Sequence, residues 1–256
     1  MHYFTNNKFD NLIIILFSIL PISILFGNLL INLTTITIGF LFLIKLIKNR
    51  SYFFNSKDNN YLFFLLLFFF LSLVVNLIFT NDINLSYPRV LKFFFIIFYI
   101  LAFKFLVLNY YENIKEIYKI WSLIFLIVIV DLIFELYFGK NILGYTSIMK
   151  GRLGSFTGQE GVIGNFFLGF CLIFLSFVYS HSQNKFWNIS LAIFLIIISL
   201  LIGERANFIK TLIAILIFIF FIYKIDIKIK IFSIILALIL VYSVMNFSHF
   251  YKWRYL

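Results

Sequence analysis

Two short stretches place arginine in a chain that is otherwise mostly Phe, Ile and Leu. Residues 151–167 read GRLGSFTGQEGVIGNFF, with Arg152 near the start, and residues 203–210 read GERANFIK, with Arg205. The planar guanidinium of arginine donates paired hydrogen bonds to phosphate or carboxylate oxygens. Glycines beside it let a ligand approach the backbone closely. The pattern predicts an anion site, for which Glu204 and Lys210 are further candidate residues.

A third basic cluster lies in NDINLSYPRVLK, where Arg89 and Lys92 are one helical turn apart. We expect Ser86 to cap a helix whose first turn contains Pro88. A basic residue at a helix N-terminus opposes the helix dipole unless an anion is bound there. Contact with lipid headgroups is the alternative. The sequence predicts a phosphate or diphosphate site with three arginines, Arg89, Arg152 and Arg205.

Acidic residues occur close to the same segments. Asp131 and Glu135, in DLIFELYFGKNILGY, are four positions apart and share one face of a predicted helix. Charged groups at membrane depth usually face a bundle interior or a watery cavity. The two carboxylates, and Glu160 with them, are candidates for neutralising an arginine, for a structural salt bridge, or for general-base catalysis toward a sugar hydroxyl.

The composition decides what kind of structure must position these groups. Hydrophobic residues make up 63% of the chain and charged residues 12%, which excludes an ordinary soluble globular protein. Long continuous apolar runs indicate membrane-spanning helices rather than the alternating strands of a barrel. We predict an all-α, polytopic transmembrane helix bundle forming a single domain over residues 1–256, with about nine spans: 11–26, 29–47, 61–80, 88–109, 117–138, 161–180, 187–202, 206–223 and 230–247.

The basic residues predict the orientation of these spans. With a cytoplasmic N-terminus, the larger share of the 21 Lys and Arg residues lies on the cytoplasmic side, as the positive-inside rule requires. Arg89, Arg152 and Arg205 then lie on the outer face, whereas the cytoplasmic side is almost entirely lysine. The net charge of +11 is scattered between apolar runs, which favours membrane orientation and lipid contact over nucleic-acid binding.

Metal and nucleotide chemistry have no sequence signal here. The one cysteine, Cys171, lies in an apolar run, and His2, His181 and His249 are far apart in the sequence. No phosphate-binding loop or dinucleotide fingerprint is present, so we expect no cofactor.

The segments DLIFELYFGKNILGY, GRLGSFTGQEGVIGNFF and LIGERANFIKTLIAI together resemble the O-antigen ligase and polymerase family of bacterial envelope proteins. The resemblance covers residues 131–214 most strongly, in the order and spacing of an acid pair, an arginine with a glycine-rich segment, and a Glu-Arg pair. The family's further periplasmic loop and helices have no counterpart before the chain ends at NFSHFYKWRYL, and we carry no role over to His249.

The resemblance implies a GT-C-like, metal-independent inverting glycosyltransferase in the bacterial inner membrane, with its site facing the periplasm. The donor it implies is a polyprenyl-diphosphate-linked glycan, and the acceptor is the lipid A core or a second lipid-linked glycan. The family's arginines hold the diphosphate, which is the role that the residues themselves predict for Arg152, Arg205 and Arg89. Two alternatives stay open: a transporter of lipid-linked or anionic solutes, and a non-catalytic membrane assembly subunit.

Overall fold

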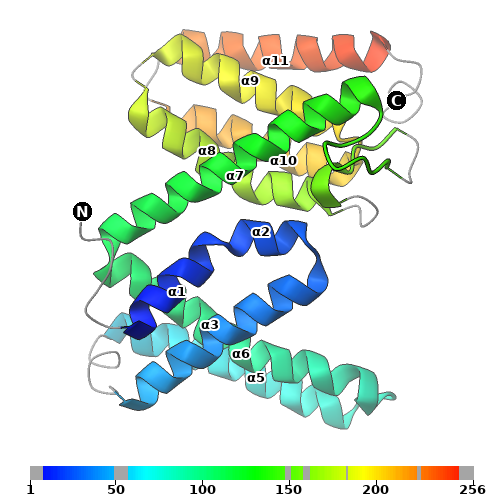
Figure 1. Ribbon diagram of the computed structural model, residues 1–256. Helices are drawn as coiled ribbons and strands as arrows, with labels where there is room; N and C mark the ends of the chain where they lie inside the picture. Colours follow the sequence, from blue (N-terminus) through cyan, green and yellow to red (C-terminus); the bar gives the residue numbers. More distant parts are fainter. Residues whose placement is uncertain are drawn as a thin grey trace. The chain divides into compact units, whose positions relative to one another are not determined.

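The regular secondary structure is helical in the parts of the protein that the computed structural model describes, which are residues 8–48, 57–147, 151–157, 162–182, 184–223 and 226–247. No strand occurs within these ranges, so the all-helical fold class is confirmed (Figure 1). The helices are α1 Lys8–Ser18, α2 Leu20–Leu25, α3 Asn28–Lys48, α5 Lys57–Ile78, α6 Ile83–Asn109, α7 Tyr111–Phe138, the 3-10 turn η1 Ser155–Thr157, α8 Ile163–His181, α9 Lys185–Leu201, α10 Arg205–Phe221 and α11 Ile227–Phe247.

Several of these helices have the length and apolar character of membrane spans, as in a multi-pass membrane protein. Among the described residues, six helices are long and apolar enough to cross a membrane, rather than the nine expected. They are α3, the Tyr61–Ile78 part of α5, α6, α7, α8 and the Ile227–Val244 part of α11.

The other three expected spans are helical but short. The segment 11–26 is divided between α1 and α2, because Pro21 has no N–H to donate to the Phe17 carbonyl and its ring conflicts with that group. Helices α9 and α10 have 17 residues each, which gives a length of about 26 Å against a hydrocarbon core of about 30 Å.

Helix α6 begins earlier than predicted. Its N-cap is Asp82, whose carboxylate accepts a hydrogen bond from the Leu85 N–H at 3.3 Å, and not Ser86. Pro88 therefore lies inside the helix and not in its first turn. Aspartate caps a helix as well as serine does, so the helix extends to the earlier cap.

The helices form two compact units, and the first comprises Met1–Ser23 and Asn28–Ile117. Within it, α3 packs on α6, α1 packs on α3, and α5 packs on α6. Aromatic rings fill the spaces: the Phe17 ring centroid lies 5.1 Å from that of Tyr99, and the Phe42 centroid lies 5.7 Å from that of Phe105. Such pairs add to the stabilisation from apolar burial.

An ion pair is buried in this first unit. Lys45 on α3 donates to Asp10 on α1, and the Tyr110 hydroxyl donates to the other carboxylate oxygen at 2.6 Å. The Lys45 ammonium also lies 3.7 Å from the centroid of the Phe105 ring, a cation–π contact. Asp10 is only 2% exposed, so its charge depends on these partners.

We expect Lys45→Met to lower the free energy of unfolding by about 3–5 kcal/mol, because it leaves the buried Asp10 carboxylate without its cation. Thermal unfolding in detergent micelles measures the change. The control is Lys48→Met, which removes an exposed lysine from the same helix. Recovery of most of the loss in the double variant Asp10→Asn/Lys45→Met is also expected, and equal destabilisation by the two lysine variants would contradict the assignment.

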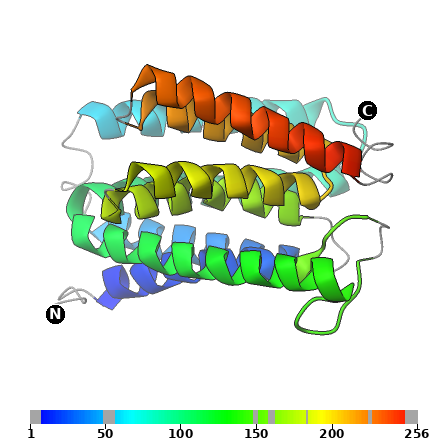
Figure 2. The ribbon, with the colours of Figure 1, turned by 90° about the horizontal axis from the view of Figure 1, so that it is seen from above.

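The second unit comprises Ile24–Gly27 and Tyr118–Leu256. Consecutive helices of this unit run in alternating directions, and α7 lies on one side of α8 and α9 with α10 and α11 on the other (Figure 2). The Phe125 ring joins α7 to α8, with its centroid 5.0 Å from that of Phe167 and 5.4 Å from that of Phe174. Helices α8 and α10 consequently begin at the end where α7 finishes.

Candidate functional site

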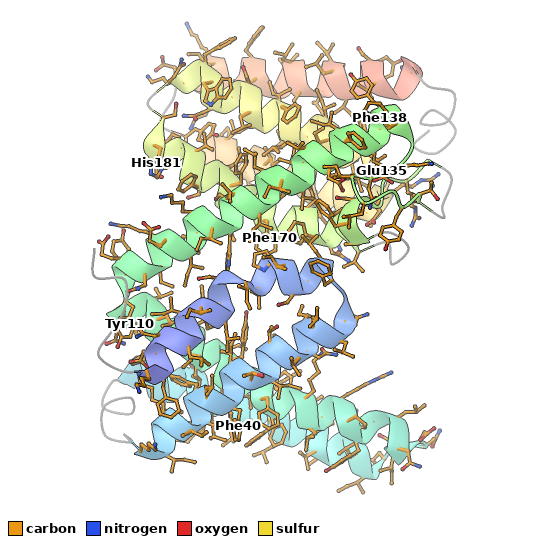
Figure 3. All side chains as sticks on the ribbon, in the orientation of Figure 1. Phe40, Tyr110, Glu135, Phe138, Phe170 and His181 are labelled. Atoms are coloured by element: carbon orange, nitrogen blue, oxygen red, sulfur yellow. The ribbon has the colours of Figure 1, made fainter. Side chains whose placement is uncertain are left out.

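The polar residues of the second unit gather where α7 ends and α8 and α10 begin. Glu135 and Phe138 lie on the last turns of α7, beside the loop that follows, and His181 marks the opposite end of α8 (Figure 3). The described parts of this loop are residues 139–147 and 151–157, and the second part includes η1. The structure thus brings Asp131, Glu135, Arg152 and Glu204 to one end of this unit, as the sequence predicted.

Two carboxylates of α7 hold the loop in place. Asp131 accepts a hydrogen bond from the Ile142 N–H at 2.7 Å and another from the Ser155 hydroxyl at 2.6 Å. Glu135 accepts from the Gly154 N–H at 3.0 Å and from the Ser155 N–H at 2.7 Å. Asp131 is 0% and Glu135 4% exposed, so both carboxylates are enclosed by the loop that they bind.

These bonds explain how the carboxylates tolerate burial. Hydrogen bonds to an ionised acceptor are stronger than neutral ones and replace the water that the group loses. Their donors are backbone N–H groups and one hydroxyl, and no arginine lies among them. Within the described residues neither Asp131 nor Glu135 pairs with an arginine, and both carboxylates bind the loop instead.

The loop has a specific shape. Ser155 has φ +46°, a left-handed conformation that non-glycine residues rarely adopt. Asn141, 2% exposed, donates from its amide to the Ser155 carbonyl at 2.7 Å and accepts from the Tyr145 N–H at 2.8 Å. The bonds from Glu135 and Asn141 on both sides of Ser155 therefore fix a strained backbone position, as is common at functional sites.

Arg152 is packed beside the turn between α9 and α10. The Leu153 N–H donates to the Ile202 carbonyl at 3.2 Å, which ties the loop to the end of α9. Gly203 has φ +82°, and a Cβ there would lie 2.6 Å from the Gly151 carbonyl oxygen and 3.5 Å from the Cγ of Arg152. Only glycine allows this approach. The Arg152 Nε is buried without a hydrogen-bond partner, which leaves a donor for a ligand.

Arg205 is the first residue of α10 and is exposed. The helix has Glu204 as its N-cap, and the Glu204 side chain accepts no hydrogen bond from a backbone N–H of the first turn. Val162, the N-cap of α8, likewise makes no side-chain cap. The first turn of α10 therefore has no side-chain cap on its backbone N–H groups, an arrangement that favours anions.

Neither arginine has an acidic partner within the described ranges. The ion pairs found there are Lys45–Asp10 and Lys115–Glu112, both outside this end of the second unit. Glu204, which adjoins Arg205 in sequence, instead accepts a hydrogen bond from the Asn207 amide. A local Glu204–Arg205 ion pair, which would neutralise this arginine, does not form.

Gly164 lies where α8 and α10 meet. A Cβ at this position would lie 2.7 Å from the Glu204 Cδ and 2.8 Å from the Asn207 Nδ2, whereas a Cβ on Gly169 would meet nothing within 4 Å. We expect Gly164→Ala to lower the free energy of unfolding by about 1–3 kcal/mol through overpacking. Thermal unfolding measures the effect, with Gly169→Ala on the same helix as the control. Equal stability of the two variants would show that the contact with Glu204 is not tight.

The other predicted residues have different places. Arg89, which is exposed, and Lys92, which donates to Asn32 on α3, belong to the first unit. Lys210 is exposed on the second turn of α10. Glu160 and His249 lie outside the described residues. The part that Arg89 and Lys92 would take in the same site stays a prediction.

Sequence reasoning missed three polar residues that the structure shows to be central. Asn141 and Ser155 hold the loop, and Asn207 holds Glu204. Each had a signal: Asn141 lies in the turn sequence GKNILGY, Ser155 follows a glycine, and Asn207 is three positions after Glu204 in an apolar helix. The described part of the chain holds no group of three or more His, Cys, Asp or Glu residues that could bind a metal ion.

Comparison with known proteins adds no assignment to this geometry. No family model, no curated protein and no solved structure matches the chain. The resemblance to the O-antigen ligase and polymerase family rests on the sequence segments alone, and the function must be argued from the loop, the arginines and the helix ends.

Proposed function

We propose that the chain binds a polyprenyl-diphosphate-linked glycan at this end of its second unit and transfers the glycan to an acceptor hydroxyl. The proposal combines the arginine site with the sequence resemblance to O-antigen ligases and polymerases. It includes the bacterial inner membrane as location, a cytoplasmic N-terminus, and a site that faces the periplasm. The acceptor is the lipid A core or a second lipid-linked glycan.

One observation carries the proposal. Arg205 lies at the start of α10, Arg152 lies beside the turn that precedes this helix, and within the described residues neither pairs with a carboxylate, while Asp131 and Glu135 hold the loop. A guanidinium that pairs with no carboxylate, close to the start of a helix, is available to bind an anion. A diphosphate on a membrane lipid supplies several oxygens for guanidinium forks and reaches the site from the bilayer.

The chemistry follows from the leaving group. The acceptor hydroxyl oxygen attacks the anomeric carbon of the donor sugar, the bond to the diphosphate oxygen breaks, and its electron pair goes to the diphosphate. Donors fixed in advance around that oxygen stabilise the charge that develops. Arg152 and Arg205 are assigned this task.

Asp131 and Glu135 are positioning residues in this scheme, since their oxygens already accept bonds from the loop. Glu160, in the same connection between α7 and α8, is the carboxylate proposed to take the proton of the acceptor hydroxyl. The loop and the arginine that it carries would thus form one wall of the site.

A turnover assay tests the function. The chain is reconstituted in nanodiscs with a radiolabelled undecaprenyl-diphosphate-linked glycan and a lipid A core acceptor, or with the lipid-linked glycan alone for polymerisation. Release of undecaprenyl diphosphate together with a larger glycan product, lost in Arg152→Ala, is the expected result. Uptake of the lipid-linked glycan across the bilayer without any product would favour the transporter, and neither activity would favour an assembly subunit.

A further inference from the structure

Glu204 lies next to both arginines yet pairs with neither. It directly precedes Arg205, and Gly203 on its other side lies against the Arg152 side chain. A carboxylate in this place would be expected to join one guanidinium and reduce its charge. The ion pairs of the described chain include no such bond. Something must direct the Glu204 side chain elsewhere.

Asn207 and Gly164 supply that direction. The Asn207 amide donates to Oε2 of Glu204 across one turn of α10. The Glu204 carboxyl carbon lies only 2.7 Å from the position that a Cβ of Gly164 would take. This places the negative charge against the first turn of α8, whose N-terminus is the positive end of the helix dipole. Glu204 is thus compensated without using an arginine.

Asn207 itself is buried and makes this bond from inside the helix packing, with an exposed fraction of 9%. A buried polar side chain in an apolar helix is costly unless its hydrogen bonds serve a purpose. The other buried residues of α10 are apolar or small, for example Phe208 and Thr211. The bond to Glu204 is therefore the specific contribution of the asparagine.

We infer that Asn207 is a positioning residue that keeps the Glu204 carboxylate over Gly164 and so keeps Arg152 and Arg205 free for an anion. The inference rests on the proposed function in that the anion is the diphosphate of the donor lipid. Loss of the asparagine releases the carboxylate, which then swings to a guanidinium and competes with the ligand. Asn207 acts through Glu204 and does not contact the ligand.

Binding of undecaprenyl diphosphate to the chain in nanodiscs gives the first readout. Asn207→Ala is expected to weaken binding about tenfold, whereas Glu204→Gln tightens it because a negative charge is removed from the vicinity. In the double variant Asn207→Ala/Glu204→Gln, affinity returns to that of Glu204→Gln. A double variant as weak as Asn207→Ala alone would overturn the inference, since Asn207 would then act without Glu204.

A second variant tests the inference independently of Asn207→Ala. Glu204→Asp keeps the charge but shortens the side chain so that it no longer reaches the Asn207 amide, and it should weaken binding as Asn207→Ala does. Binding as tight as in the wild type would contradict the inference. Thermal unfolding of all variants identifies any that do not fold. If Asn207→Ala is one of them, the affinity of Glu204→Asp tests the inference instead.

A measurement without ligand separates this inference from the proposed function. Phenylglyoxal modifies free guanidinium groups faster than ion-paired ones, and peptide mass spectrometry follows Arg152 and Arg205 separately. Slower modification of either arginine in Asn207→Ala, restored in the double variant, supports the positioning role even if no diphosphate lipid binds. Equal rates in the wild type and Asn207→Ala overturn it, even if the lipid does bind.

Discussion

Replacement of Glu135 by alanine is expected to lower the free energy of unfolding by about 3–5 kcal/mol and to release the loop after α7. The carboxylate accepts bonds from the Gly154 and Ser155 N–H groups, and it is 4% exposed. Each bond to a charged acceptor contributes about 1.5–3 kcal/mol, and its loss leaves buried N–H groups without a partner. Thermal unfolding measures the stability, and limited proteolysis near Arg152 reports the release of the loop.

Two further variants control this experiment. Glu135→Gln keeps the shape but offers a single neutral acceptor oxygen, so an intermediate loss is expected. Glu112→Ala removes an exposed carboxylate from the opposite end of the same helix and should change stability by less than about 0.5 kcal/mol. Glu135→Ala with the stability and protease resistance of Glu112→Ala would contradict the anchoring role.

Removal of both arginines has the largest expected effect on binding. Arg152→Ala and Arg205→Ala should each weaken binding of undecaprenyl diphosphate at least about tenfold, since one hydrogen bond to a charged group corresponds to about that factor. The double variant should abolish saturable binding. Microscale thermophoresis of the chain in nanodiscs measures the affinities.

The controls test geometry as well as charge. Lys228→Ala removes one positive charge at the start of α11, the end of the second unit opposite to the arginines, and should bind as the wild type does. Arg152→Lys keeps the charge but loses the fork and the Nε donor, so it should bind more weakly than the wild type. Equal affinity in Lys228→Ala and Arg152→Ala would mean that the lipid responds only to net charge.

The lengths of the apolar runs and the composition were enough to predict an all-helical fold with several membrane-type helices. They were not enough to count the spans, because the total apolar content does not show where a helix breaks. Pro21 divides one expected span, and the polar ends at Lys185 and Arg205 shorten two others to 17 residues. The cap of α6 at Asp82 shows the same limit, since two good capping residues lay close together in sequence.

For the candidate site, the sequence predicted which residues meet but not which atoms bond. Asp131, Glu135 and Arg152 converge at one end of the second unit because the helices alternate in direction. Whether a carboxylate pairs with an arginine or with backbone N–H groups depends on the path of the loop. Ser155, at φ +46°, sets that path, and such a conformation cannot be recognised from residue type.

The buried Asp10–Lys45 pair was missed for a related reason. The two residues are 35 positions apart and each looked like an ordinary charge at the end of an apolar segment. Only the packing of α1 on α3 brings them together, beside the Phe105 ring. Pairing of distant charges is a property of tertiary structure, which a single sequence does not contain.

Binding of undecaprenyl diphosphate to the wild-type chain, compared with undecaprenyl monophosphate in the same nanodiscs, tests the central claim most directly. Arg205 at the start of α10 and Arg152 beside the turn that precedes it predict saturable binding that is at least about tenfold tighter for the diphosphate. Absence of saturable binding, or equal affinity for the two lipids, would contradict a diphosphate site at this end of the protein.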